Sequence, residues 1–75
     1  MREFLEVGGL TFMIGDNGVR QVEVEFSIDP SNDDIEPFFI KIDVPSTGDA
    51  TADIGAAKKV LQQLSLRIAQ ALKVE

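Results

Sequence analysis

The sequence predicts an α+β fold, in which a meander of three or four antiparallel strands carries one C-terminal helix packed on one face. Apolar and polar side chains alternate in several stretches between residues 10 and 44, with the period of half-buried strands. After residue 50 the apolar side chains recur every three or four positions, which is the period of a helix. A chain of 75 residues makes one domain. Its expected elements are strands at about 3–7, 10–15, 19–28 and 37–44 and a helix at about 51–73.

The strands are predicted from their alternation. The clearest is VEVEFSI, residues 22–28, and the pattern recurs in LTFMI and FIKIDV, whereas EFLEV predicts a short edge strand set apart by two glycines. The apolar even-numbered positions are Leu10, Phe12, Ile14, Val22, Val24, Phe26, Ile28, Phe38, Ile40, Ile42 and Val44. We expect the helix to cover this even face, which supplies the core, and the odd face to stay open.

The first turn follows from register. If the even-numbered residues of 10–14 and 22–28 share a face, the two residue numbers of every cross-strand pair must add to an even sum. A two-residue turn at Asn17-Gly18 gives an odd sum, whereas a three-residue loop from Asp16 to Gly18 pairs Phe12 with Val22. Gly18 also suits the left-handed residue that ends such loops, so we predict the three-residue loop.

The helix is predicted from its apolar stripe and its ends. The stripe consists of Ile54, Ala57, Leu61, Leu64, Ile68, Ala71 and Leu72. Thr51 or Asp49 can cap the start, Asp53 lies in the first turn, and Lys73 is expected in the last turn. Leu66 lies about 140° from Leu61 around the helix, so it is a candidate contact in a homodimer.

The composition excludes several chemistries. The chain has no cysteine, histidine, tryptophan or tyrosine, which excludes disulfides, thiolate and imidazole metal ligands and the usual general base near neutral pH. No nucleophile–base pair or phosphate-binding loop is present, so we expect no catalytic residue, no cofactor and no enzyme activity. The apolar runs are too short for a membrane span and no signal-peptide pattern is present, so we expect a cytoplasmic protein without a membrane partner.

The charge is divided unevenly along the chain. Residues 1–53 carry a net charge of −9 and residues 54–75 a net charge of +3, which makes −6 in total. Direct binding to nucleic acid needs a basic surface, so it is not expected. A protein with a basic surface is the more natural partner.

The stretch SIDPSNDDIEP, residues 27–37, collects the carboxylates Asp29, Asp33, Asp34 and Glu36 between two strands. Asp29, Ser31 and Asp33 fall at positions 1, 3 and 5 of a calcium-binding loop. However, Asp34 stands where that loop needs glycine and Ile40 where it needs glutamate. We therefore predict a solvated connecting loop and assign no metal-binding residue, with a weak divalent-cation site as the third hypothesis for the protein.

The open face supplies the preferred functional hypothesis, a non-enzymatic domain that presents acidic side chains to a basic protein surface. The predicted partner-binding residues are Glu23, Glu25, Asp43, Phe39, Asp29, Asp33, Asp34 and Glu36. Two registers are possible for the second hairpin, one placing Lys41 opposite Glu25 and one placing it opposite Glu23. The alternative hypothesis is a self-associating structural module, such as a small homodimer or oligomer subunit.

One concrete form of the preferred hypothesis is an inhibitor of a nucleic-acid-binding or defence complex. In its size, acidity and lack of catalytic side chains the chain resembles phage-encoded anti-defence proteins such as anti-CRISPRs. No motif in the sequence carries that resemblance, so no family is assigned.

Overall fold

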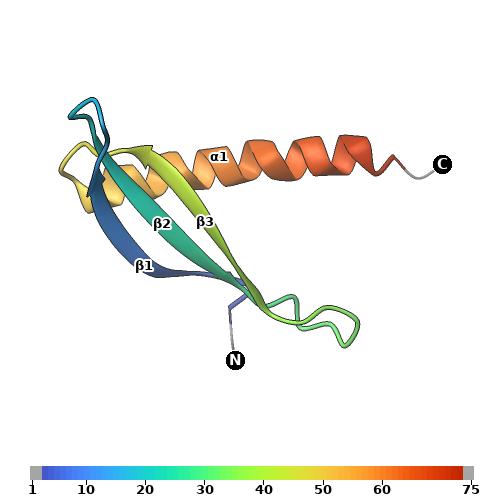
Figure 1. Ribbon diagram of the computed structural model, residues 1–75. Coiled ribbons are helices and arrows are strands. Elements are labelled where there is room, and N and C mark those ends of the chain that lie inside the picture. The colour runs from blue at the N-terminus through green and yellow to red at the C-terminus, as the bar shows by residue number, and fades with distance from the viewer. Residues whose placement is uncertain (1–2, 74–75) are drawn as a thin grey trace.

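A computed structural model describes residues 3–73. It contains a three-stranded antiparallel sheet followed by one C-terminal helix, as the sequence predicts (Figure 1). The elements are β1 (Leu5–Ile14), β2 (Arg20–Ile28), β3 (Phe38–Pro45) and α1 (Ala50–Ala71). The strands lie in the order β1-β2-β3, so consecutive strands are neighbours.

The first hairpin has the predicted three-residue loop. Phe12 lies opposite Val22, and the N–H of Gly15 donates to the carbonyl of Val19 at 2.9 Å. Gly18 has a φ of 78°, a left-handed conformation that glycine adopts without a steric penalty. The hairpin register is therefore set by both the turn and the apolar pattern.

The two N-terminal strands of the prediction are one strand. Residues 3–7 and 10–15 were expected as separate strands, but β1 is continuous, with a bulge between Val7 and Gly9. A bulge inserts one extra residue into a strand, so odd-numbered and even-numbered residues exchange faces on its N-terminal side. As a result Leu5 and Val7 lie opposite Ile28 and Phe26 on the core side of the sheet, although they are odd-numbered.

The core lies between α1 and the even face of β2 and β3. Its buried members are Val22, Val24, Phe26, Ile42, Val44 and Ala57. The helix packs on β3 and, less extensively, on β2, whereas it leaves β1 largely uncovered. The expectation that Phe12 and Ile14 join the core is therefore wrong: they are 62% and 75% exposed. The reason is that one helix is too narrow to cover a twisted three-stranded sheet completely.

The helix begins and ends one or two residues before its predicted bounds. Asp49, one of the two predicted caps, accepts a hydrogen bond from the N–H of Thr51 at 3.0 Å. The helix ends at Ala71 with Leu72 as its C-cap, so Lys73 lies beyond the last turn. Within residues 3–73, no helix combines the length and the apolar character needed to cross a membrane.

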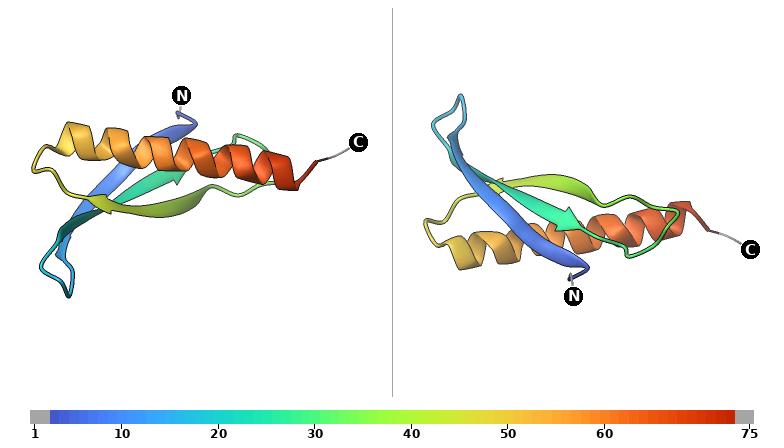
Figure 2. Two further views of the ribbon diagram at one scale, coloured as in Figure 1. Left: turned by 90° about the horizontal axis from the view of Figure 1, so that it is seen from above. Right: turned by 90° about the horizontal axis from the view of Figure 1, so that it is seen from below.

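Helix and sheet are close together at one end only. They meet near the linker of residues 46–49 and diverge towards the C-terminal end of α1 (Figure 1). Seen from above and from below, β1 runs obliquely across α1 (Figure 2). Accordingly the buried residues of α1 are Asp53 and Ala57, both in its first half. The second half of the helix projects from the sheet with much of its surface exposed.

Candidate protein-interaction surfaces

The sheet face opposite α1 is acidic. Side chains on this acidic face include Glu6, Glu23, Glu25, Phe39, Lys41 and Asp43. The second hairpin adopts the first of the two predicted registers, so Glu25 lies opposite Lys41 and Glu23 lies opposite Asp43. Two carboxylates that face each other directly across a strand pair repel.

Lys41 compensates this repulsion only in part. Its Nζ lies 3.9 Å from Oε1 of Glu23, the diagonal neighbour, and its side chain is well exposed. An exposed ion pair of that length contributes little to stability. Within residues 3–73, neither Glu25 nor Asp43 has a cationic partner. The acidic face therefore carries four carboxylates and one ammonium group.

Gly8 of β1 makes room for one of these carboxylates. A Cβ added at Gly8 would lie 3.3 Å from Oε1 of Glu25, so this carboxylate lies above the bulge of β1. The same bulge turns Glu6 onto the acidic face, opposite Ser27. The sequence prediction missed Glu6 because it treats residues 3–7 as a separate edge strand and assigns none of them to a face.

The predicted acidic loop lies at the far end of the sheet. Residues 29–37 connect β2 to β3 and extend past the strand ends, on the order of 13 Å or more along the chain from Glu25 (Figure 1). The side chain of Asp29 accepts from the N–H of Ser31 at 3.0 Å, and that of Asn32 accepts from the N–H of Asp34 at 2.8 Å. These are turn-forming hydrogen bonds, as the sequence predicts for this stretch.

The four loop carboxylates do not converge on one point. Within residues 3–73, no group of three acidic side chains is placed to hold a metal ion. Asp33, Asp34 and Glu36 are exposed and lie around the loop, whereas Asp29 is partly buried at its base. The structure therefore separates the loop from Glu23 and Asp43, which form the centre of the acidic face.

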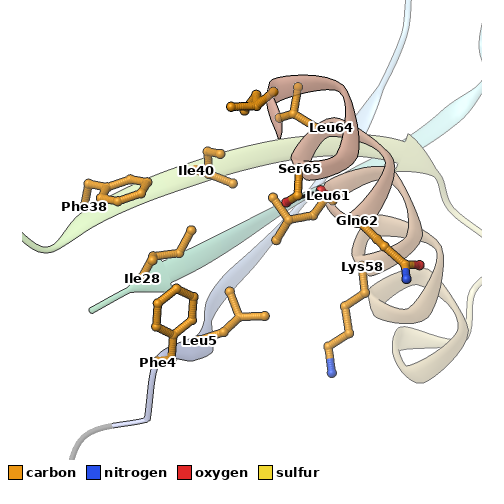
Figure 3. A pocket seen from close by; sticks show the side chains of 11 residues that line it. Phe4, Leu5, Ile28, Phe38, Ile40, Lys58, Leu61, Gln62, Leu64 and Ser65 are labelled. Carbon is orange, nitrogen blue, oxygen red and sulfur yellow. Dashed lines mark hydrogen bonds between the residues drawn. The ribbon is translucent and has the colours of Figure 1, made fainter. Parts of the chain in front are cut away.

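An apolar groove lies on the other side of the sheet. It has a volume of about 530 Å³ and is open to solvent where α1 and the sheet diverge (Figure 3). Its sheet side consists of Phe4, Leu5, Ile28, Phe38 and Ile40. Its helix side consists of Leu61, Leu64 and Ile68 together with the polar residues Lys58, Gln62 and Ser65. Within the described chain nothing covers this groove.

The apolar stripe of α1 runs from the core into this groove. Ala57 is buried and Leu61 is partly buried, but Leu64, Ile68 and Leu72 are 39%, 49% and 65% exposed. Leu66, the predicted oligomer contact, is 59% exposed and lies on the outer side of the helix, away from the groove. The periodicity alone did not distinguish the buried half of the stripe from the exposed half.

A buried carboxylate anchors the start of α1. Asp53 is 1% exposed. Its Oδ1 accepts hydrogen bonds from the N–H and the hydroxyl of Thr47 at 2.9 and 2.8 Å, and its Oδ2 accepts from the Ser46 hydroxyl at 3.1 Å. The pKa of this carboxyl is lowered, mainly by the hydrogen bond from the backbone N–H of Thr47, whereas burial acts in the opposite direction and raises it. Asp53 therefore fastens the linker to the helix, a structural role that explains its burial without a catalytic function.

No protein-family model, curated protein or solved structure matches this chain. The acidic face and the groove are therefore the two candidate functional surfaces of the described chain.

Proposed function

We propose that this protein is a non-enzymatic interaction domain whose acidic face binds a basic surface of another protein. The observation that carries the proposal is the pairing of Glu23 with Asp43 across β2 and β3. Like charges in that position lower the stability of the free protein. A basic partner would neutralise this repulsion. Part of the free energy by which the repulsion destabilises the unbound protein would then favour binding.

Neighbouring side chains support the same proposal. Phe39 is exposed on the acidic face and Met13 is partly exposed there, so the face offers apolar area beside its charges. Interfaces commonly combine an aromatic or methionine contact with surrounding polar groups. The exposed carboxylates of the loop, Asp33, Asp34 and Glu36, extend the negative potential towards one end of the sheet.

The charge of the face restricts the class of partner. Four carboxylates and one ammonium repel a phosphate backbone, so nucleic acid is not the direct ligand. A protein that itself binds nucleic acid presents a basic cleft, which matches this face in sign. An inhibitor that occupies such a cleft is therefore the concrete form of the function that we propose.

Affinity capture from lysate of the native host tests the proposal. The bait proteins are wild type and the double variant Glu23→Lys/Glu25→Lys, which raises the net charge by four at the centre of the face. The matched control is Glu3→Lys/Asp16→Lys, which makes the same charge change at exposed positions outside the acidic face. Circular dichroism establishes that all three baits are folded.

We expect wild type and control to retain a basic protein that the Glu23/Glu25 variant loses. Because the attraction is between largely exposed charges, raising the salt concentration should release the partner. A basic partner retained equally by all three baits would contradict the proposal. Loss from both charge-reversal variants would show that only net charge matters, and that outcome would also count against the acidic face as a specific site.

A further inference from the structure

We infer that the groove is the binding site for a second copy of this chain. In this dimer, each copy places the second half of its α1 in the groove of the other, around a twofold axis. The inference does not depend on the acidic face, which lies on the opposite side of the sheet.

The exposed area of the chain is too large for a compact monomer. Its accessible surface is 6116 Å², whereas a folded monomer of 8.2 kDa exposes about 4,500 Å². The excess of roughly 1,600 Å² is about twice what one partner buries in an interface of standard size. The Cα radius of gyration leads to the same conclusion, because it is 14.4 Å and a compact chain of this length has about 11 Å.

The shape and chemistry of the groove fit a helix. Its walls are apolar and diverge, and apolar grooves of this kind bind amphipathic helices through residues spaced three or four apart. Leu64, Ile68 and Leu72 have that spacing and lie on the uncovered half of α1. The apolar stripe of α1 continues beyond the groove to Leu72, so a small apolar ligand in the groove would leave the end of the stripe exposed.

The chain therefore carries both the groove and the helix that fits it. When one surface holds both complementary parts, two copies satisfy each other reciprocally, and the assembly closes as a twofold dimer without free sites. A different partner would have to supply an equivalent helix and would leave this chain's own helix to be covered separately.

Charge favours the same occupant. Residues 54–73 contain four basic and no acidic side chains, whereas residues 3–53 contain twelve acidic and two basic ones. Of these acidic side chains, those of the loop at residues 29–37 adjoin the groove, because Ile28 and Phe38, which flank the loop, both line it. Placing the helix of one copy in the groove of another therefore brings its basic side chains towards this loop. Complementary charge speeds association and sets the orientation of the partners.

The mass of the full chain in solution tests the inference, measured by light scattering or sedimentation over a range of concentrations. Wild type is expected at twice 8.2 kDa, with a melting temperature that rises with protein concentration. Ile68→Glu places a carboxylate in the proposed interface and should raise the dimer dissociation constant at least about 30-fold, the loss expected for one interface hot spot.

Leu66→Glu is the matched control. It makes the same kind of change two residues away, at an exposed leucine on the outer side of α1. We expect the Leu66 variant to remain a dimer. Phe38→Glu, on the sheet side of the groove, should dissociate the dimer as Ile68→Glu does, because both sides of the groove take part.

A wild type that stays at 8.2 kDa up to about 100 μM, far above the working range of a micromolar dimer, would overturn the inference. So would a dimer that Leu66→Glu dissociates and Ile68→Glu leaves intact, because the contact would then lie on the outer side of the helix. If Ile68→Glu loses its helical signal, Leu72→Glu replaces it, since that position is 65% exposed and lies at the end of α1. A Leu72→Glu dimer as tight as wild type would then overturn the inference.

Discussion

Ala57 is the residue through which α1 contributes a buried side chain to the hydrophobic core, and enlarging it tests the fold directly. Its side chain is fully buried in the core with Val22, Val24 and Phe26. Ala57→Leu adds three carbon atoms where no space is open. Such overpacking costs about 1–3 kcal/mol.

Against the whole stability of the chain this cost is large. A protein of 75 residues has an unfolding free energy of roughly 4–11 kcal/mol. A loss of about 2 kcal/mol lowers the melting temperature by about 8–16 °C for a domain of this size. It also lowers the urea midpoint by about 1–2 M.

The neighbouring Ala56 provides the matched control, because it is exposed on the same helix. Ala56→Leu introduces the same side chain, and leucine and alanine have similar helix propensities, so the unfolding free energy should change by less than about 0.5 kcal/mol. The chain lacks tryptophan and tyrosine, so urea unfolding is followed by circular dichroism at fixed protein concentration. Equal midpoints for the two variants would refute the packing of α1 through Ala57.

Three further predictions concern the turn, the cap and the linker. Gly18→Ala should lower the unfolding free energy by about 1–2 kcal/mol, because the φ of Gly18 is 78°, which is left-handed. Gly55→Ala should raise it by about 0.5–1 kcal/mol, because the added Cβ would enter open space on a helix. Asp49→Ala should cost about 1 kcal/mol in the same urea assay through loss of the N-cap. The pKa of Asp53 is lowered below its ordinary value of 3.8, so its stabilising effect is present above that pH and is lost as the pH falls through the folded-state pKa. Melting temperatures of wild type between pH 7 and 2 should therefore fall at the acid end more steeply than those of Asp53→Asn.

The fold could be predicted because its local signals agree with one another. The alternation in β2 and β3 buries most of the even-numbered side chains that the sequence singles out, with Phe38 an exception at 42% exposed. Gly18 ends the turn that their register requires. What could not be predicted is the bulge in β1. Gly8 and Gly9 look like a break between two strands, because glycine is both a common turn residue and a common bulge residue.

The candidate surfaces were predictable to a lesser extent. Glu23, Glu25 and Asp43 share the open face as expected, because a period of two determines the face of a strand residue. The loop carboxylates do not join them, because the loop extends past the strand ends. The alternation determines the face on which a side chain lies, but not its distance from other side chains on that face. The groove was missed because a helical stripe has the same period whether it is buried along its whole length or only along half of it.

The two surfaces fit together in one arrangement. The groove opens on the even face and the carboxylates lie on the odd face, so a dimer formed through the grooves would leave both acidic faces accessible. It would also cover the apolar half of α1 that a monomer leaves in water. Two acidic faces on one particle can engage a partner with two basic sites more tightly than either face alone, provided that the spacing matches. The two proposals, self-association through the groove and binding of a basic protein through the acidic face, are thus compatible with each other.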